Sequence, residues 1–430
     1  MEQIGVIYSG NSINFREKIK TFFKGKKSDK AEDIVKNQEV GVKVEVKEDE
    51  TGLIDEIIKE KQNAKQYSSV VSEQSSNIAN DLLKGGDDDE ELLTFLNETK
   101  PKICIIGCGG AGCNTIARLS QMNVKGAELI ALNTDVHHLL KMKCDKKLLI
   151  GKKLTKGMGA GSNPEIGEAA AKESKAEIEK AIEGASMIFI TGGMGGGTGT
   201  GSGHIVAEIA KNKGILTIGI VTLPFFSEGR QRRKNALDGL NRLRKKSDTT
   251  IVIPNDKLLT LAPDLPLNTA FKLSDEILAG AAKGITELIT KAGLVNLDFA
   301  DMKTILLNGG YAVIGTGEST TSTKPEERAK YAIEMALNSP LIDATIDDAG
   351  RALINVIGGA DMTLREAELM ATEVADKIAH DSHIIWGARI DESLPKNVIK
   401  VLVVIAGAEF PEYKLESEKI DKIEVELDSI

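Results

Sequence analysis

Three glycine-rich stretches, each opening a predicted helix, constrain the fold of this chain more than any other feature of its sequence. They cover residues 107–114 (GCGGAGCN), 156–164 (KGMGAGSNP) and 192–201 (GGMGGGTGTG). The first and the last follow apolar runs, KICIIG and MIFIT, which are typical of strands buried in a sheet. Glycines at such a junction let backbone N–H groups approach a phosphate, and the helix N-terminus adds positive potential. The pattern therefore predicts a sheet whose strand ends hold a phosphorylated ligand.

Strands and helices alternate along the chain as in a parallel sheet covered by helices on both faces. Apolar runs predict strands at 102–107, 127–134, 148–151, 187–191 and 215–224. Helical periodicity predicts helices at about 112–122 and 164–183, another that ends near 212, and a long one at 267–292. Beyond it, strands at 311–317, 353–359 and 398–407 and helices at 325–337 and 363–379 follow. We expect a Rossmann-like parallel sheet, a long central helix and a second α/β domain.

The first hundred residues follow a different pattern. Phe15, Ile19, Phe22 and Phe23 recur at helical spacing among lysines and predict a basic amphipathic helix. Predicted strands at 4–8 and 40–46 flank it, which favours a small appended α/β unit over a helix that binds anionic lipid. Both alternatives stay open. Residues 66–86, rich in Ser, Gln and Asn, read as a linker before an acidic lead-in helix.

Composition excludes several function classes. The net charge of −9 opposes binding to nucleic-acid phosphates, so we expect no nucleic-acid partner. The four cysteines form no CxxC pair and the five histidines are scattered, so we expect neither a disulfide framework nor a protein metal site. No apolar run reaches the roughly 18 residues of a membrane-spanning helix, and we expect a soluble, cytoplasmic protein.

The first glycine stretch alone is ambiguous. Gly107, Gly109 and Gly112 satisfy GxGxxG, and Asp135 follows at the distance of a ribose-binding acid, so an NAD-binding oxidoreductase fits this stretch equally well. The other two stretches favour a triphosphate, because three cradles exceed what a pyrophosphate needs. No GxxxxGK[ST] pattern is present, so the loops are not a standard P-loop.

Six segments in a fixed order carry a specific resemblance. They are GCGGAGCNT, ALNTD, TKGMGAGSNPEIG, GGMGGGTGTG, IVIPNDKLL and NLDFADM, between about Lys102 and Ala408. Together they resemble the tubulin/FtsZ family of GTPases, in the form found in archaeal cell-division members. The resemblance implies a GTPase that forms head-to-tail filaments, is stimulated by assembly, and works in the cytoplasm at the mid-cell division site.

The resemblance also implies a role for each motif residue. The implied phosphate ligands are Gly109, Gly110, Ala111 and Asn114 for the α- and β-phosphates, Ala160, Gly161 and Asn163 for the γ-phosphate, and Gly195, Gly196, Gly197, Thr198 and Gly199 around all of them. Glu228 and Arg232 match positions that hold the ribose and phosphates, and Asn255, Phe271 and Asp275 match the guanine side. Mg²⁺ is expected on the phosphates.

Several of these residues have a plainer interpretation when they are taken alone. Glu228 and Arg232 are four apart and fit an ordinary helix-surface ion pair. Asn255 fits a turn or a helix N-cap, and Asp275 fits a solvated acid on a helix. The resemblance instead implies that a buried Asp275 carboxylate accepts the guanine N1–H and 2-amino hydrogens, which adenine does not offer.

Two acids near the middle of the chain are the candidate catalytic residues. Asp298 and Asp301 alone predict an N-cap and a first-turn acid of a helix. The resemblance implies that they act, with Asn296, on the GTP of the neighbouring subunit by orienting the attacking water. A non-hydrolysing tubulin-like scaffold, the second alternative, is expected to lack these acids.

The sequence patterns and the resemblance together divide the chain into six parts. They are an appended unit or amphipathic extension (1–65), a linker with the lead-in helix (66–100), the GTP-binding domain (101–265), the central helix (266–294), the C-terminal α/β domain (295–408) and a tail (409–430). Its implied partners are further copies of the chain and a membrane-adaptor protein. Direct membrane contact through the N-terminal basic helix is the remaining alternative.

Overall fold

One ten-stranded sheet organises the part of the chain that the structure describes. The computed structural model describes residues 101–409, apart from 262–265, 292, 296 and 343. The strands are β1 (Ile103–Cys108), β2 (Ala127–Asn133), β3 (Lys146–Leu149), β4 (Met187–Gly193), β5 (Leu216–Leu223), β6 (Thr249–Pro254), β7 (Gly310–Glu318), β8 (Arg351–Gly358), β9 (His383–Ile390) and β10 (Ile399–Ala406). The predicted N-terminal elements, the lead-in helix and nearly all of the tail lie outside the described residues.

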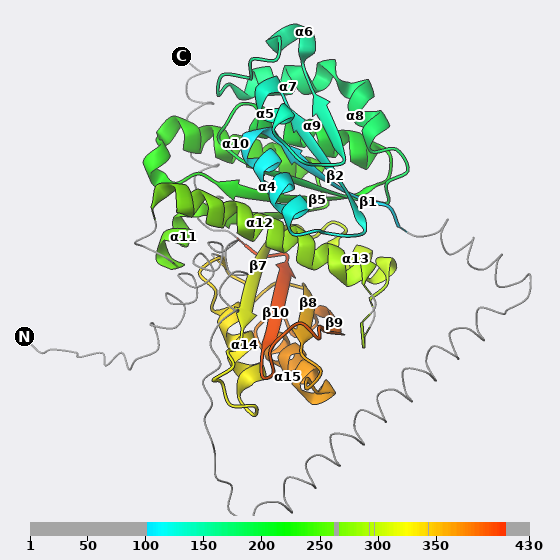
Figure 1. Cartoon of the computed structure of the whole chain (residues 1–430), viewed down its shortest axis with the longest axis vertical. Coiled ribbons are helices and arrows are strands. Elements are labelled where there is room, and N and C mark those ends of the chain that lie inside the picture. Colours follow the sequence, from blue (N-terminus) through cyan, green and yellow to red (C-terminus); the bar gives the residue numbers. More distant parts are fainter. Residues whose placement is uncertain (1–100, 262–265, 292, 296, 343, 410–430) are drawn as a thin grey trace, which may run out of the picture. The chain divides into compact units, whose positions relative to one another are not determined.

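The first six strands are all parallel, which confirms the predicted Rossmann-like sheet. Their order is β3-β2-β1-β4-β5-β6, so the direction of winding reverses between β1 and β4. Ligands of open α/β sheets bind outside the carboxyl ends of the strands at such a reversal. The first and third glycine stretches follow β1 and β4, and the fold therefore brings them to this place (Figure 1).

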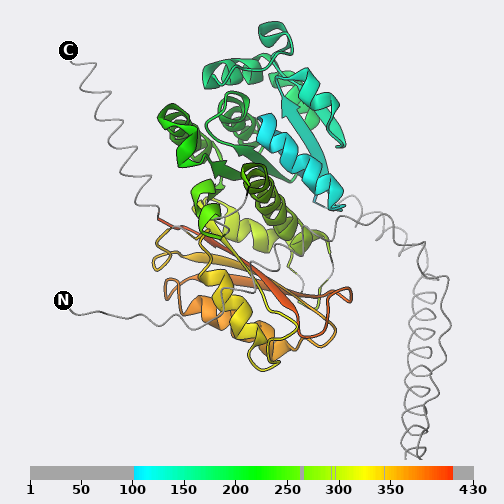
Figure 2. The same cartoon turned by 60° about the vertical axis from the view of Figure 1, so that its left-hand side comes forward.

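The second half continues the same sheet as a mixed one. β7 pairs with β6 in parallel, β10 lies antiparallel between β7 and β8, and β9 runs parallel to β8 at the edge. Helices α14 (Arg328–Leu337) and α15 (Leu364–Ala375) cover one face of these strands (Figure 2). This arrangement confirms the predicted second α/β unit. Within the described ranges, no helix is both long and apolar enough to cross a membrane.

Alternate residues of each buried strand face two separate apolar cores. Ile103 and Ile105 of β1 belong to the core that contains residues of α4 (Gly109–Gln121) and α12 (Leu267–Thr290). Cys104 and Ile106 belong to the core on the other face, with residues of α9 (Thr198–Asn212) and α10 (Arg230–Lys246). The two-residue period of a strand produces this division, and it explains why β1 is apolar without interruption.

Several element boundaries differ from the prediction. The helix predicted at 164–183 is two helices, α7 (Pro164–Glu173) and α8 (Lys175–Ala181), because Ser174 leaves the helical conformation and its hydroxyl accepts the amide of Gly151 at 3.0 Å. β6 and β9 were not predicted. The remaining helices are α5 (Val136–Leu140), α6 (Lys152–Thr155), η1 (Phe226–Glu228), α11 (Asn255–Leu261) and α13 (Phe299–Leu306).

Helices α7 and α9 touch through glycine. A methyl group on Gly201 of α9 would overlap the carbonyl oxygen of Pro164, and one on Gly167 of α7 would overlap that of Gly197. The second and third glycine stretches open these two helices, so the glycine contact also sets how closely the two loops approach.

Gly201→Ala is therefore expected to lower the free energy of unfolding by about 3 kcal/mol, because neither backbone can yield without shifting a helix. Gly203→Ala, in the same buried helix, is the matched control. Its added methyl would lie 3.9 Å from the nearest atom, so the change should be neutral or stabilise by up to about 1 kcal/mol. Urea unfolding of both variants checks this, and equal stabilities would contradict it.

Candidate functional site

The loops that follow β1 and β4 are in direct backbone contact. A methyl group on Gly109 would lie 2.7 Å from the amide nitrogen of Gly199, and one on Gly199 would lie 3.0 Å from the carbonyl oxygen of Cys108. Gly109 also has a φ of +72°, a left-handed conformation that glycine adopts readily. Glycine is thus required at both positions for the two loops to meet.

The helices that these loops open have free N-terminal ends. The N-cap residues of α4 and α9, Cys108 and Gly197, make no side-chain capping hydrogen bond, and neither helix has an acid in its first turn. The first N–H groups of a helix lack intrahelical partners and bind anions readily. Two such ends side by side are suited to an anion, which fits the predicted phosphates.

The second glycine stretch closes the site from another side. A methyl group on Gly197 would lie 2.9 Å from both the Cβ of Ala160 and the amide nitrogen of Asn163. Gly157, Gly159 and Gly161 all have positive φ, so the stretch follows a path that side chains would strain. All three glycine stretches therefore meet at one place.

Four glycines of these stretches face open space. No atom lies within 4 Å of a methyl group placed on Gly110, Gly159, Gly161 or Gly196. Open space of this kind leaves room for a ligand beside the backbone. At Gly110 and Gly196, which do not have a positive φ, neither close packing nor a left-handed backbone requires glycine.

Two threonines stabilise the glycine-rich loop. The hydroxyl groups of Thr134, after β2, and Thr198 lie 2.7 Å apart, and the Thr200 hydroxyl accepts the amide of Gly195 at 2.8 Å. We did not predict Thr134 or Thr200 as site residues. Thr134 stands in the ALNTD segment directly after a predicted strand, and that position at the carboxyl edge was the available signal.

A second group of predicted residues meets at the start of α12. The rings of Phe225 and Phe271 are 5.4 Å apart and nearly perpendicular. Asn255 is 5% exposed and accepts a hydrogen bond from the Ser274 hydroxyl at 2.8 Å, so α11 and α12 touch beside Asp275. Asn255, Phe271 and Asp275 are thus brought together from two helices. Asn255 is the first residue of α11, close to its predicted place at a helix start.

Asp275 is not the solvated helix acid that its position in the sequence alone suggested. Partial burial and, to a smaller extent, the negative charge of Glu276 together raise the pKa of its carboxyl to about 7. A carboxylate that loses hydration without gaining a protein cation is poised to accept hydrogen bonds from a ligand. This environment is the one that the family resemblance implied.

Glu228 and Arg232 form the ion pair predicted from their spacing. Arg232 Nε lies 3.0 Å from Glu228 Oε2, and Glu228 Oε1 accepts the amide of Phe225 at 2.8 Å. A methyl group on Gly195 would lie 2.7 Å from Arg232 Cγ, so the pair also borders the glycine-rich loop. The pair connects the phosphate end of the site to the aromatic end.

Asp298 and Asp301 form the predicted helix start. Asp298 caps α13 by accepting the amide of Asp301 at 2.7 Å, and Asp301 Oδ2 accepts the amide of Asp298 at 3.2 Å. Two reciprocal bonds fix the backbone of both acids. Asn296 lies outside the described residues.

The acids and the glycine loops lie at opposite edges of the sheet. Phe271 marks the start of α12, and Thr290 at its end packs on Gly126, which immediately precedes β2 at the amino edge of the parallel strands. The 24 residues of α12 span about 36 Å. Figure 1 shows α11 at one end of α12 and α13 at the other. The acids therefore cannot reach the cradle of their own chain.

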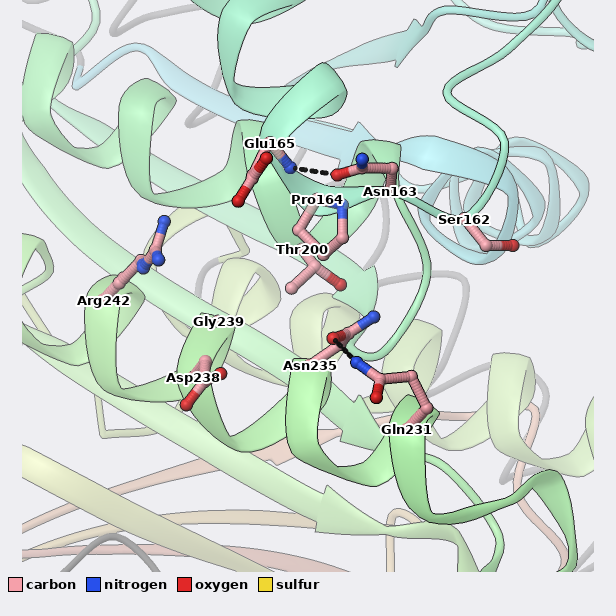
Figure 3. A pocket seen from close by; sticks show the side chains of 10 residues that line it. All are labelled: Ser162, Asn163, Pro164, Glu165, Thr200, Gln231, Asn235, Asp238, Gly239 and Arg242. Carbon is pink, nitrogen blue, oxygen red and sulfur yellow. Dashed lines mark hydrogen bonds between the residues drawn. The ribbon is translucent and has the colours of Figure 1, made fainter. Parts of the chain in front are cut away.

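A polar cavity of about 360 Å³ adjoins the second glycine stretch (Figure 3). The start of α7, with Ser162 and Asn163, forms one wall, and α10, with Gln231 and Asn235, forms another. The Asn163 side chain accepts the amide of Glu165 at 2.8 Å and so caps α7. The lining suits water or a polar group better than an apolar ligand.

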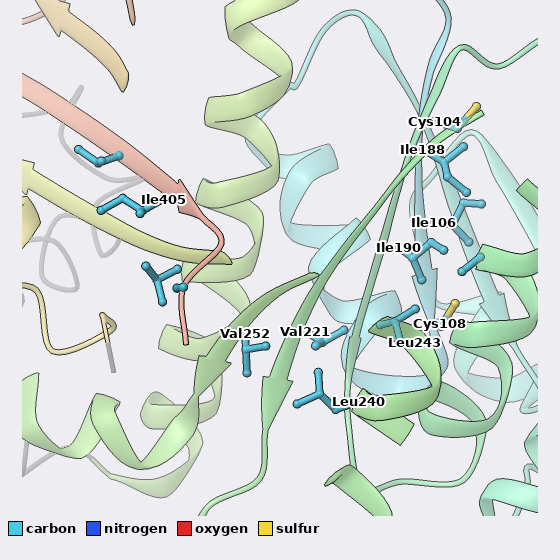
Figure 4. Close-up of a cluster of buried hydrophobic side chains, with 14 of the residues drawn as sticks. Cys104, Ile106, Cys108, Ile188, Ile190, Val221, Leu240, Leu243, Val252 and Ile405 are labelled. Atoms are coloured by element: carbon cyan, nitrogen blue, oxygen red, sulfur yellow. The ribbon is translucent and has the colours of Figure 1, made fainter. Parts of the chain in front are cut away.

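The cysteines beside the cradle are not nucleophiles. Cys108 lies in the apolar core of the sheet with Cys104 (Figure 4). Burial raises the pKa of Cys108 and of Cys113 to about 12, so both remain thiols at neutral pH. Asp135, the ribose-binding acid of the oxidoreductase alternative, instead caps α5 by accepting the amide of His138 at 3.1 Å.

Comparison with known proteins identifies relatives over most of this chain. Residues 102–263 match the model of the Tubulin/FtsZ family, GTPase domain, and residues 310–409 match that of the FtsZ family, C-terminal domain. The chain is 53% identical over 338 residues to "Cell division protein FtsZ 1" of Methanocaldococcus jannaschii, covering 78% of this chain and 92% of the relative. The corresponding protein of Thermococcus kodakarensis is 54% identical over 333 residues, covering 77% and 88%.

Solved structures show the same fold. "FtsZ dimer, empty (M. jannaschii)" matches with a TM-score of 0.70 and 54% identity, over 75% of this chain and 93% of that one. The GTPγS-bound protofilament of CetZ2 from Haloferax volcanii matches with a TM-score of 0.65 over 75% and 99%, and at 24% identity it supports the fold alone.

The buried carboxyl of Asp275 gives a test without any ligand. Its folded pKa of about 7 lies above its ordinary value of 3.8, so burial costs little below pH 4 and costs increasingly more as the pH rises toward 7. Asp275→Asn should therefore stabilise the ligand-free protein by roughly 1–3 kcal/mol at pH 8, and much less at pH 5. Urea unfolding at the two values measures this. Asp347→Asn, at an exposed acid, controls for the lost charge, and an equal effect of the two changes would contradict the prediction.

Proposed function

The chain belongs to the tubulin/FtsZ family of GTPases, and we propose that it hydrolyses GTP only between subunits of a head-to-tail filament. One subunit supplies the glycine cradle and the next supplies the acids. The observation that carries this proposal is that the two groups lie toward opposite ends of α12, a helix about 36 Å long.

The cradle binds the three phosphates through backbone N–H groups. The proposed ligands are Gly109, Gly110, Ala111 and Asn114 from the first stretch, Ala160, Gly161 and Asn163 from the second, and Gly195, Gly196, Gly197, Thr198 and Gly199 from the third. The contact between the stretches and the two uncapped helix ends support this assignment. Glu228 and Arg232 hold the ribose and the phosphates beside them.

The base binds at the start of α12. Asp275 accepts the N1–H and 2-amino hydrogens of guanine, while Asn255 and Phe271 hold the ring. Selectivity over adenine follows, because adenine would leave the buried carboxylate without donors. The contacts among these elements support the assignment. The raised pKa of Asp275 supports it too, because its causes are burial and the charge of Glu276, and no described cation offsets them.

Hydrolysis needs a water held in line with the γ-phosphorus. The capping box takes one oxygen from each of Asp298 and Asp301, which leaves the other oxygen of each carboxylate to orient that water in the neighbouring cradle. Asn296 joins them. Mg²⁺ bound with the phosphates would neutralise part of their charge. In the described ranges no three His, Cys, Asp or Glu gather where they could bind a metal.

Assembly thereby completes the catalytic site. Hydrolysis then removes the γ-phosphate, which forms part of the contact between subunits. A filament that turns over in this way suits a division ring at mid-cell, attached to the membrane through an adaptor protein. Direct attachment through the basic N-terminal helix rests on residues outside the described ranges. The presence of both acids disfavours the non-hydrolysing scaffold, and the family membership removes the oxidoreductase alternative.

Complementation between two inactive variants tests catalysis across the interface. Asp298→Asn/Asp301→Asn keeps the helix cap and the cradle but removes the carboxylates. Gly110→Leu keeps the acids and fills the cradle, where the structure has open space for a side chain. Each variant alone should release phosphate at least tenfold more slowly than the wild type. Their mixture should recover activity, because the loop of the second subunit completes the cradle of the first.

Phosphate release per molecule should also rise with wild-type protein concentration. A mixture as inactive as its components, or a wild-type rate per molecule that does not change with concentration, would reject hydrolysis between subunits. Mixing either variant with itself at doubled concentration is the control for simple mass action.

GTP affinity should depend on pH through Asp275. With a pKa near 7, the carboxyl is mostly ionised at pH 8 and mostly protonated at pH 6, and only the ionised form accepts both guanine hydrogens. Monomer affinity for GTP should fall by up to roughly tenfold between these values. Asp275→Asn shares every other pH effect and should bind weakly at both values. An equal slope in wild type and variant would contradict the assignment.

A further inference from the structure

The loop that carries Asp298 rests on the edge strand β9. We define the acid loop as residues 293–298. Its Leu294 and Val295 amides both donate to the Ala388 carbonyl oxygen, at 2.8 and 3.2 Å, and the Ala388 amide donates back to Val295 at 3.4 Å. A methyl group on Gly293 would lie 2.6 Å from that same carbonyl oxygen. The acid loop is therefore paired with β9 at backbone distance.

A buried ion pair holds the root of the acid loop. Glu287, in the last turn of α12, is 5% exposed, and its Oε2 lies 3.0 Å from Arg389 Nη2 on β9. Its Oε1 lies 2.7 Å from Lys291 Nζ, directly before the loop. Arg389 follows Ala388, the residue that pairs with the loop, and Asp391 faces its other amino group at 3.8 Å. Lys283, one turn earlier in α12, lies 3.9 Å from Glu287 Oε1. One carboxylate thus joins α12, its cap residue Lys291 and β9, the strand on which the acid loop rests.

The end of α13, the helix that Asp298 caps, is also held by an arginine. Arg351 of β8 donates to the carbonyl oxygen of Leu307 at 2.5 Å and more weakly to that of Ile305 at 3.5 Å, both at the end of α13. β8 and β9 are adjacent parallel strands. Arg351 of β8 contacts the end of α13, and Arg389 of β9 contacts the end of α12, so Asp298 lies between two segments that these strands hold.

We propose that Arg389, acting through Glu287, is a positioning residue that sets where Asp298 and Asp301 enter the neighbouring subunit. The proposal rests on the proposed function, in which these acids complete the neighbour's cradle. The acids project from a helix whose own start is rigid, so their place is decided by how the loop and α13 sit on β8 and β9. A displacement of about 1 Å in such a group can cost a hundredfold in rate.

A purely stabilising role is the competing explanation, and buried ion pairs are weak stabilisers. Removing one partner alone leaves a buried charge and can unfold the protein, so the informative variant is Glu287→Met/Arg389→Met, which removes both buried members. Their other partners, Lys283, Lys291 and Asp391, are more exposed and keep access to water. The control is Glu318→Gln/Lys400→Met. This pair joins β7 and β10 in the same half of the sheet at 3.7 Å and is largely exposed.

We expect the Glu287→Met/Arg389→Met protein to unfold cooperatively and to bind GTP as a monomer within twofold of wild type, because its cradle is distant. Hydrolysis per assembled subunit, with assembly followed by sedimentation, should fall by roughly tenfold or more. The control variant should stay within twofold. An Arg389-deficient protein that hydrolyses at the wild-type rate per assembled subunit would overturn the proposal.

Mixing separates positioning from general damage. Subunits with Gly110→Leu carry an intact acid loop on an intact β9, so adding them should restore hydrolysis in the cradle of the Glu287→Met/Arg389→Met subunits. Failure of this rescue would overturn the positioning role, since it would place the defect in the cradle or the fold. A wild-type rate per molecule that is flat against concentration would instead reject hydrolysis between subunits, and with it the ground for this inference.

Discussion

The packing of α12 against both halves of the sheet sets the geometry on which the site depends. Toward the first half, Arg118 of α4 forms an ion pair with Glu276. Toward the second, Gly284 lies so close to Leu402 that an added methyl would be 2.6 Å from it, and the Asn355 amide donates to the Gly284 carbonyl oxygen at 3.2 Å. A helix held from both sides along its length keeps the cradle and the acids apart. Their separation is therefore a property of the folded subunit and does not depend on a ligand.

Local signals predicted the first half of the fold well. Each glycine stretch marks a turn that leads into a helix, and about ten residues of sequence are enough to recognise such a turn. β6 was missed because its six buried residues follow a charged helix directly, with no glycine or proline to mark the turn. β9 was missed for another reason. Its burial alternates poorly, since the acid loop covers part of an edge strand, and that cover is a tertiary contact.

The same distinction applies to the site. The capping box of Asp298 and Asp301 was predictable, because a three-residue spacing at a helix start contains all the geometry that it needs. The environment of Asp275 was not, because the contacts of Asn255 with Ser274 and of Phe225 with Phe271 beside it join residues distant in sequence. The resemblance to family motifs identified Asp275 by its position, although those motifs do not describe the packing around it.

The cradle and the acids are each held rigidly, so the way in which two subunits dock is the remaining variable. The cradle is fixed by contacts between glycines that permit no side chain, and the acids are fixed by reciprocal hydrogen bonds to each other's backbone. Neither half needs to rearrange for a water to be oriented between them. Preorganised groups of this kind lower a barrier only when they are brought to the reacting atoms. Under the proposed function, control over hydrolysis lies in whether, and how accurately, two subunits meet, which is why the contact of the acid loop with β9 matters as much as the acids.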